Sequence, residues 1–312
     1  MNFDVPFRVL TTVPAPIFVP LEDGRYEHRF SDQLRMIYDP QQKMISSRWI
    51  SQPRPCFNPA LLADLRAYTS FVAGTRGSLE INGERHPIEY VVEASDMPGV
   101  FNLGGDLDLF KRLIAESDRD GLLRYGRACV DVLYPNYRGY DMPCTTVSLV
   151  QGECLGGGFE AALSSDVIVA EKGARFGFPE TLFNLFPGMG AFSFLEVKVG
   201  AKTAEKLIMS GQIYSAEQMH DMGVVDVVAE DGEGDAALAE LVRRRGRQFN
   251  SYTAMAAVRR TVKPVSFEQL MDVVEIWVDA ALRLTPRDLK LMQRLVGRQN
   301  GIQEPAASAS VH

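Results

Sequence analysis

The sequence predicts an α/β layered fold, because segments with strand patterning alternate with segments of helical periodicity. Two apolar segments, "TTVSLV" at 145–150 and "DVIVAE" at 166–171, predict strands in the middle of the chain. A long helical stretch from about 106 to 134 precedes them, and mainly helical segments follow. A chain of 312 residues can bury one substantial core, so we expect one large domain.

The N-terminal part predicts an arm, a hairpin and a capped helix. Residues 1–30 are rich in proline and predict an extended arm. "LRMIYDP" and "KMISSRWI" alternate well enough to be two strands of a hairpin joined at 39–42. "NPALLADLRAYTSFVAG" predicts a helix, since Asn58 can cap it and Pro59 suits its first turn. "IEYVVEAS" follows as a buried strand.

The C-terminal part predicts helices with defined starts. Ser215 and Ser266 each precede a glutamine by three residues, which is capping-box spacing, and Pro286 suits the first turn of a last helix. Apolar residues between 266 and 284 recur with helical periodicity, so that helix has a face to bury. "EDGEGD" at 230–235 is the clearest predicted loop.

Composition excludes several classes of protein. A hydrophobic content of 46% and a charged content of 23% are those of a globular protein. No apolar run approaches the roughly 18 residues of a membrane span, and the N-terminus lacks a basic segment followed by an apolar one. We therefore expect a cytoplasmic protein that does not enter the membrane. A net charge of −7 argues against nucleic acid as the main partner.

The cysteine pattern predicts free thiols. No CxxC pair is present, and the cysteines lie mostly in apolar stretches, so buried thiols are expected rather than disulfides or a metal site. The four cysteines are Cys56, Cys129, Cys144 and Cys154.

The most informative segment is "LVQGECLGGGFEAALSSD" at 149–166. Its glycine triplet could be a dinucleotide fingerprint, but five residues separate it from the preceding strand, and Glu160 would place a negative charge near a pyrophosphate. The glycines could instead only permit a tight turn and close helix packing. A third interpretation is chemical: the first amides of the following helix are unpaired donors that can hold an oxyanion.

Two further features favour the chemical interpretation. "VFNLGGDLDLF" supplies a second glycine pair, Gly104 and Gly105, before an acidic helix start, and an oxyanion hole usually needs two N–H groups. Glu160, in the first helical turn, has a possible partner in Glu180 of "ARFGFPE". Two carboxylates beside an oxyanion hole are the groups needed to move protons at a carbon next to a thioester carbonyl.

Five motifs, in this order, resemble the signature of the crotonase (enoyl-CoA hydratase/isomerase) superfamily: "FNLGGDL", "GECLGGGFEAALSSDVIVA", "FGFPE", "PGMGA" and "AEKLIMSGQIYSAEQMHDMGVVDVV". The resemblance implies the crotonase fold, with a ββα spiral core over 31–250 and a C-terminal helical oligomerisation region over 251–312 that forms a trimer or a pair of trimers. Within the superfamily, "VFNLGGDLDLF", "NLFPGMGAFSF" and "VVEIWVDAAL" look most like the diffusible signal factor synthases.

The resemblance also implies roles for single residues. The oxyanion amides would be those of Gly105 and Gly157, and the catalytic carboxylates would be Glu160 and Glu180. Glu180 would take the C2 proton of a 3-hydroxyacyl thioester, and protonated Glu160 would give its proton to the departing hydroxyl.

Two residues are candidates for the acyl pocket, with a core role equally open for each. They are Met189, close to Glu180 in the family pattern, and Trp277, on the apolar C-terminal helix. The basic run at 243–247 could meet an acidic carrier protein or a CoA phosphate, although a solvated helix face is the commoner meaning of such a run.

The implied function is a dehydratase and thioesterase that converts a 3-hydroxyacyl thioester to a free cis-2-unsaturated fatty acid signal. "RHPIEYVVEASDMPGVFNLGG" differs from the usual hydratase approach to the site, which favours acyl carrier protein over CoA as the carrier. A sensor kinase is a further implied partner, and no resident cofactor is expected. The alternatives are an enoyl-CoA hydratase or isomerase of fatty acid metabolism, and a catalytically silent crotonase-fold protein that binds an acyl ligand or a partner.

Overall fold

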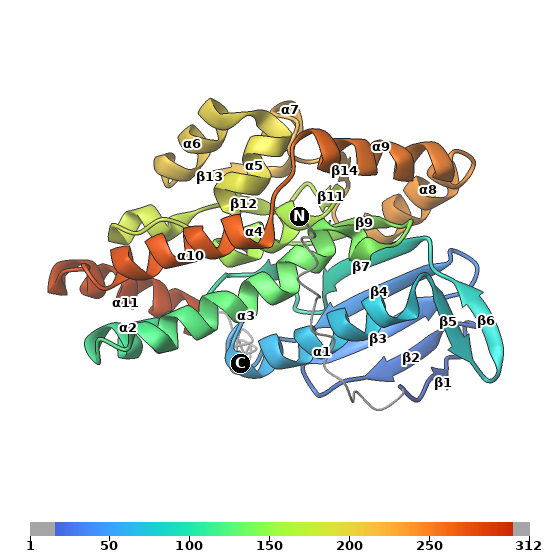
Figure 1. The fold of residues 1–312 in the computed structure, drawn as a ribbon, viewed down its shortest axis with the longest axis horizontal. Coiled ribbons are helices and arrows are strands. Elements are labelled where there is room, and N and C mark those ends of the chain that lie inside the picture. Colours follow the sequence, from blue (N-terminus) through green and yellow to red (C-terminus); the bar gives the residue numbers. More distant parts are fainter. Residues whose placement is uncertain (1–15, 302–312) are drawn as a thin grey trace, which may run out of the picture.

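The main sheet of the protein has eight strands and forms the centre of the fold (Figure 1). The structure is a computed structural model that describes residues 16–301. The first four strands pair antiparallel, and from β4 onward the strands are parallel. In sheet order the strands are β1 (Val19–Pro20), β2 (Tyr26–Arg29), β3 (Leu34–Asp39), β4 (Met44–Trp49), β7 (Tyr90–Ser95), β9 (Thr145–Val150), β11 (Val167–Glu171) and β14 (Val227–Ala229).

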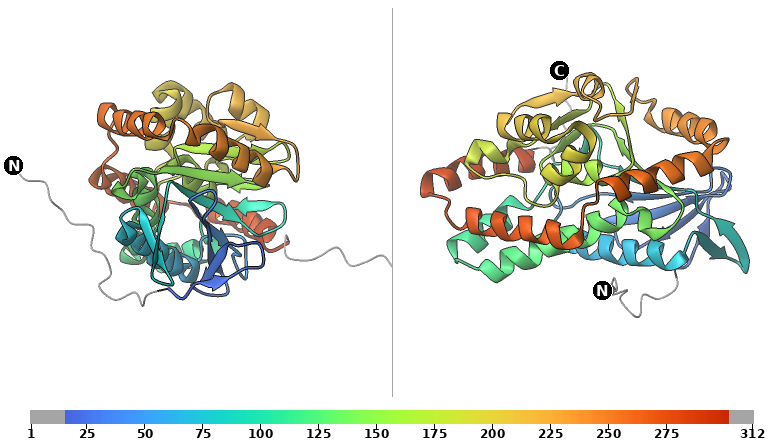
Figure 2. Two further views of the ribbon diagram at one scale, coloured as in Figure 1. Left: turned by 90° about the vertical axis from the view of Figure 1, so that its right-hand side faces the viewer. Right: turned by 45° about the horizontal axis from the view of Figure 1, so that its top comes forward.

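Four strands form a second sheet. The chain enters this sheet directly after it leaves strands of the main sheet. Three of its strands are parallel, and the fourth, β13, pairs antiparallel with β12. In sheet order the strands are β13 (Ile213–Ser215), β12 (Arg175–Gly177), β10 (Glu153–Leu155) and β8 (Val100–Asn102). Along the chain β10 follows β9 and β12 follows β11, so the chain repeatedly passes from the main sheet to the second sheet. The hairpin of β5 (Ser78–Ile81) and β6 (Glu84–Pro87) stands apart from both sheets, at one end of the molecule (Figure 2).

Helices cover both faces of the main sheet. The larger core cluster lies between the sheet and the layer that contains α1, α3 and α4, and the smaller cluster lies under α8. The helices are α1 (Pro59–Thr75), α2 (Leu107–Ala115), α3 (Arg119–Tyr137), α4 (Gly157–Ser164), α5 (Ala191–Val199), α6 (Ala201–Ser210), α7 (Ala216–Asp221), α8 (Gly234–Gly246), α9 (Phe249–Val262), α10 (Phe267–Ala281) and α11 (Pro286–Gly301), with 3₁₀ turns η1 (Gly139–Asp141) and η2 (Pro179–Phe183).

Several sequence predictions are confirmed. The predicted hairpin is β3–β4, with Leu34 opposite Trp49. Helix α1 begins at Pro59, and the Asn58 side chain accepts a hydrogen bond from the amide of Leu61 at 2.9 Å. The four cysteines are free and buried, and no described helix is long and apolar enough to cross a membrane.

The predicted arm over 1–30 is wrong for its second half. Tyr26–Arg29 is strand β2, which pairs with β3 and so extends the main sheet. Proline-rich composition predicted an arm, but the free edge of the hairpin provides backbone groups for one more strand. Residues 1–15 lie outside the described part of the chain. The division of the chain at 31 and 251 otherwise stays a prediction.

The long helical stretch predicted over about 106–134 consists of two helices, α2 and α3. Ser117 adopts a left-handed conformation with φ of 53°, which ends the first helix. The Asp118 side chain then accepts a hydrogen bond from the amide of Gly121 at 2.8 Å and caps the second. Residues 116–120 are all polar, so the sequence did carry a signal for this break.

The C-terminal helices begin where the sequence predicted. Ser215 and Gln218 form both halves of a capping box at α7, and the Ser266 side chain accepts from the Gln269 amide at α10. Helix α10 lies along α3 and buries Leu270 and Trp277 (Figure 1). This packing brings Trp277, from the C-terminal part of the chain, to the middle of the fold.

Replacing Asn58 tests the start of α1. The Asn58 side chain caps the helix and also donates to the Gln33 side chain and the Gln52 carbonyl, both at 2.8 Å. Asn58→Ala is expected to lower the free energy of unfolding by about 2 kcal/mol in urea denaturation. Asn58→Asp retains the accepting oxygen but places a second oxygen against the Gln33 and Gln52 carbonyl oxygens, so it should lose at least as much. Equal stability of the alanine variant and the native protein would show that the cap contributes nothing.

Candidate active site

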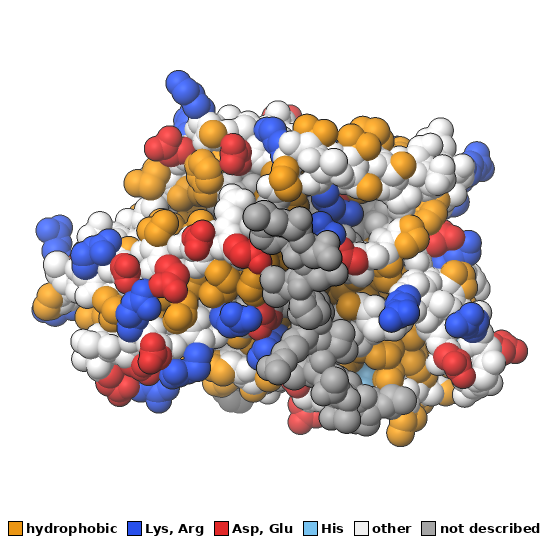
Figure 3. Space-filling view, in the orientation of Figure 1, with side chains coloured by type: hydrophobic (Ala, Val, Ile, Leu, Met, Phe, Trp, Pro, Cys, Tyr) orange, Lys and Arg blue, Asp and Glu red, His pale blue; other side chains and the backbone are white. Residues whose placement is uncertain are grey.

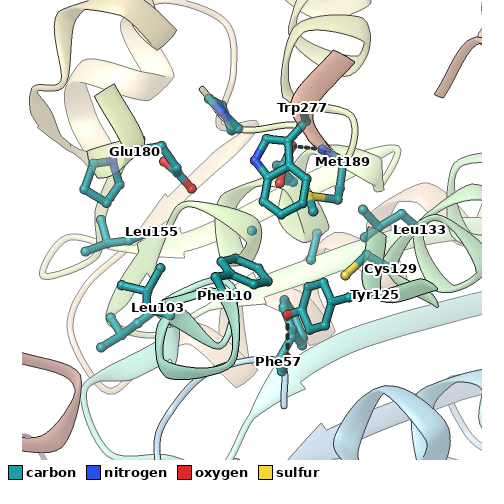
Figure 4. A pocket seen from close by; sticks show the side chains of 18 of the residues that line it. Phe57, Leu103, Phe110, Tyr125, Cys129, Leu133, Leu155, Glu180, Met189 and Trp277 are labelled. Atoms are coloured by element: carbon teal, nitrogen blue, oxygen red, sulfur yellow. Dashed lines mark hydrogen bonds between the residues drawn. The ribbon is translucent and has the colours of Figure 1, made fainter. Parts of the chain in front are cut away.

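All six site residues predicted from the sequence line one pocket of about 130 Å³. Most of its other lining side chains are apolar, which is typical of a site that takes an acyl chain. Figure 4 shows Glu180, Met189 and Trp277 around this space, opposite Phe110, Tyr125 and Cys129. The six predicted residues are Gly105, Gly157, Glu160, Glu180, Met189 and Trp277.

Two glycine backbones meet at the pocket wall. A Cβ atom on Gly104 would lie 2.8 Å from the amide nitrogen of Gly157, and one on Gly157 would lie 3.5 Å from the amide nitrogen of Gly105. The Asn102 side chain accepts from the Gly104 amide at 2.8 Å and holds this turn. Gly157 is the first residue of α4, where helix geometry leaves amides without partners inside the helix. The amides of Gly105 and Gly157 are therefore neighbours on one wall.

The other two glycines of the triplet have separate structural reasons. Gly156 has φ of +53°, and a Cβ there would lie 2.3 Å from Oε1 of Glu180. A Cβ on Gly158 would lie 2.2 Å from the carbonyl oxygen of Asn102. Gly156 thus leaves room for the carboxyl group of Glu180, and Gly158 lets α4 pack against β8. Residues 151–155 separate the strand predicted at 145–150 from the glycine triplet, and strand β10 lies within this segment.

Glu160 is buried on α4 and points at the start of α5. Its Oε1 accepts hydrogen bonds from the amides of Met189 at 2.8 Å and Ala191 at 3.0 Å. Burial raises the pKa of Glu160 to about 7, and these backbone amides oppose that rise because they favour the ionised form.

Glu180 lies in the first turn of η2 and has fewer partners. Burial, and then the charge of Glu160, raise the pKa of Glu180 to about 8. Its Oε2 is buried and accepts no hydrogen bond within the described part of the chain. Several backbone amides oppose the rise at Glu160, whereas at Glu180 only its own amide does, so Glu180 holds a proton more readily than Glu160.

Trp277 and Met189 close the pocket on the side of α10. The Trp277 ring packs against Phe110 of α2 with ring centroids 5.1 Å apart. A Cβ on Gly188 would lie 2.3 Å from the Trp277 ring, so the segment before Met189 passes directly under the indole. Met189 and Trp277 are both buried and both line the pocket. Each side chain therefore belongs to the core and to the pocket wall.

A third carboxyl group, that of Glu93, also lines the pocket and was not predicted. Glu93 is 4% exposed on the central strand β7, and burial raises its pKa to about 8. The available signal was a carboxylate between apolar residues of the segment "IEYVVEAS", which we assigned only to a buried strand. Within residues 16–301, no group of three His, Cys, Asp or Glu side chains could hold a metal ion.

The basic run does not border the pocket. Arg243, Arg244 and Arg245 lie in the last turn of α8. This helix packs on the face of the main sheet opposite the larger core cluster. Arg243 forms an ion pair with Glu240, and the Arg245 guanidinium lies over the ring of Tyr252. Within one chain, these residues behave as a solvated helix face.

The arrangement of two carboxyl groups and two glycine amides around an apolar pocket fits a known family. The family model for enoyl-CoA hydratase/isomerase matches residues 80–277. The chain therefore belongs to the enoyl-CoA hydratase/isomerase family, the crotonase superfamily, which confirms the resemblance seen in the motifs.

Comparisons with curated proteins cover part of the chain. It is 39% identical over 100 residues to mevalonyl-coenzyme A hydratase SIDH of Beauveria bassiana (strain ARSEF 2860), which is 32% of this chain and 35% of that protein. It is 29% identical over 151 residues to human mitochondrial methylglutaconyl-CoA hydratase, 48% of this chain and 42% of that protein. The matched segments thus span less than half of these relatives.

Comparisons with solved structures show the fold. Human mitochondrial delta3-delta2-enoyl-CoA isomerase superposes with a TM-score of 0.70 and 18% identity, covering 87% of this chain and 100% of that one. DspI of Pseudomonas aeruginosa superposes with a TM-score of 0.62 and 21% identity, covering 75% of this chain and 90% of that one. The predicted crotonase fold is confirmed.

Two adjacent glycines provide a matched test of the backbone crossing. Gly158→Ala would force a Cβ into the Asn102 carbonyl, whereas the closest atom to a Cβ on Gly157 is 3.4 Å away. We expect Gly158→Ala to lower the free energy of unfolding by about 3 kcal/mol and Gly157→Ala by much less, measured by urea denaturation. Equal losses for the two variants would contradict the packing of α4 on β8.

Glu93 should make stability depend on pH. Its folded pKa of about 8 lies above the ordinary value of 4.5. As the pH rises between these values, the unfolded chain ionises Glu93 first, so the free energy of unfolding falls. Glu93→Gln cannot ionise and should show a shallower fall between about pH 5 and 8 in urea denaturation. The same pH dependence in both proteins would show that Glu93 is not held neutral.

Proposed function

We propose that the protein adds or removes water across the C2–C3 bond of an acyl thioester. The observation that carries this proposal is the placement of Glu160 and Glu180 in one apolar pocket with the adjacent amides of Gly105 and Gly157. Two N–H donors on one wall can stabilise an enolate oxygen, and two carboxyl groups can move the two protons that the reaction needs.

In dehydration, the thioester carbonyl oxygen would accept hydrogen bonds from the amides of Gly105 and Gly157. Glu180 would remove the C2 proton, and the resulting enolate would be stabilised by the two amides. Protonated Glu160 would then give its proton to the leaving 3-hydroxyl group, which departs as water. One missing donor in such a hole typically costs about 10²–10³ in rate.

The finer proposal is that the product is a free cis-2-unsaturated fatty acid of the diffusible signal factor type. Its support is the likeness of the glycine, proline and C-terminal helix motifs to the signal synthases. Release of the free acid needs thioester hydrolysis, in which water attacks the carbonyl carbon. The same two amides would stabilise that tetrahedral intermediate. A carrier-protein thioester is the proposed substrate.

Hydration of an enoyl-CoA is the second candidate, and the resting position of the proton favours it. Backbone amides stabilise ionised Glu160, while Glu180 has no comparable donors. Ionised Glu160 can activate water for attack at C3, and protonated Glu180 can then protonate C2. Dehydration starts from the opposite arrangement of this proton.

We also propose that the protein forms an oligomer and that a sensor kinase is one of its partners. Helix α9 exposes Tyr252, Met255, Val258 and Val262, spaced so that they share one helix face (Figure 3). Such an apolar face supports the proposed trimer or pair of trimers, because isolated proteins rarely expose large apolar patches. A catalytically silent acyl-binding protein is the remaining alternative, and the two intact carboxyl groups argue against it.

Product analysis of two variants tests the mechanism. We expect Glu160→Gln and Glu180→Gln each to lower turnover of 3-hydroxyacyl and 2-enoyl thioesters by about 10²–10⁴, because each removes one proton-transfer group. Glu205→Gln, at an exposed position on α6, is the matched control and should keep full activity. Circular dichroism of all three variants checks that the fold is intact.

Mass spectrometry of the native protein's products then separates the candidates. Free cis-2-enoic acid from a 3-hydroxyacyl carrier protein supports the signal synthase. Interconversion of trans-2-enoyl-CoA and 3-hydroxyacyl-CoA without free acid supports the hydratase. Turnover of neither thioester contradicts both and leaves the silent binding protein.

A further inference from the structure

The face of the main sheet that borders the pocket carries a row of three polar side chains. Glu93 on β7 lies opposite Ser47 on β4 and opposite Ser148 on β9. Successive side chains of a strand point to opposite faces. Glu93 therefore points to the same side as Val91, which belongs to the larger core cluster. A polar row across this apolar face needs a physical reason.

The carboxyl group of Glu93 is incompletely hydrogen-bonded. Its Oε2 is buried and has no hydrogen-bond partner within residues 16–301, and the same is true of the buried Tyr140 hydroxyl nearby. Tyr68 of α1 also lies within the electrostatic reach of Glu93. Unpaired buried polar groups are rare in native proteins because each loses its hydration without replacement. Glu93 thus has capacity to bind a polar group.

Glu93 shares the pocket with the catalytic carboxyl groups but lies apart from them. Neither Glu160 nor Glu180 contributes to the pKa of Glu93, which burial alone raises. The pocket wall also includes apolar side chains from α1 and α3, namely Leu62, Leu65, Val132 and Leu133. The pocket therefore has a reaction end and a second polar point, with apolar walls around both.

We propose that Glu93 binds a hydroxyl group on the acyl chain, remote from the thioester, so that the preferred substrates are hydroxylated along or at the end of the chain. A neutral carboxyl group donates one hydrogen bond and accepts others, and a hydroxyl group does the same, so the two satisfy each other. Because Oε2 is already buried by protein atoms, a plain alkyl chain along the pocket would leave the carboxyl group without water or a partner. The inference rests on the proposed function only in that the pocket holds an acyl chain.

Binding of unreactive ligands tests the proposal without catalysis. Suitable probes are saturated methyl ketones of increasing chain length, each with and without a terminal hydroxyl group. They keep the carbonyl oxygen but can neither lose water nor be hydrolysed. Trp49 and Trp277 are the two tryptophans of the chain, and both line the pocket, so quenching of intrinsic fluorescence reports binding. At the best chain length we expect the hydroxylated ketone to bind about tenfold more tightly.

Variants assign the preference to Glu93. Glu93→Gln can still donate and accept and should keep much of the tenfold preference, whereas Glu93→Leu should reverse it in favour of the plain ketone. Ser148→Ala is the matched control: Ser148 belongs to the polar row but not to the pocket lining, so the preference should remain. The native protein alone decides the outcome if a variant fails to fold.

Two results would overturn the proposal: no preference for the hydroxylated ketone at any chain length in the native protein, or a preference that Glu93→Leu retains. Absence of binding by both ketones would overturn it as well. These outcomes are independent of turnover, since Glu160→Gln and Glu180→Gln should bind the ketones with the same preference. If the native protein turned over no acyl thioester but kept that preference, the proposed function would be contradicted and this inference would stand.

Discussion

The close approach of two backbone segments, the turn at Gly104 and Gly105 and the start of α4 at Gly157, is the constraint on which the site depends. Both segments connect a strand of the second sheet to a helix, so the sheet holds them at a fixed separation. A side chain on Gly104 could not fit between them, because its Cβ would lie 2.8 Å from the amide nitrogen of Gly157. The same contact sets the direction of α4 and therefore the position of Glu160.

The carboxyl pair follows from this placement through a second set of backbone groups. The start of α5 directs the amides of Met189 and Ala191 at Glu160, while η2 brings Glu180 over Gly156. A buried carboxylate with two amide donors and a buried carboxyl without them differ in protonation, although both are glutamates. The direction of main-chain N–H groups thus gives the two glutamates different surroundings.

Helix α10 and the central strand β7 define the rest of the pocket. Trp277 arrives from far along the chain because α10 packs along α3. Glu93 arrives from the opposite side, because strand alternation turns it toward the larger core cluster. The elements that pack around the apolar pocket define its space. Three carboxyl groups, those of Glu93, Glu160 and Glu180, line that space.

The sequence by itself determined the local features: the cap at Asn58, the β3–β4 hairpin, the capping box at Ser215, and the family motifs that carry the glycines and the two glutamates of the pocket. These depend on neighbours within a few residues, so spacing reveals them. The tertiary structure decided the pairing of β2 with the sheet, the hydrogen-bond surroundings of Glu160 and Glu180, and the position of Glu93. Each of these depends on contacts between segments distant in sequence, which determine burial and the available hydrogen-bond donors.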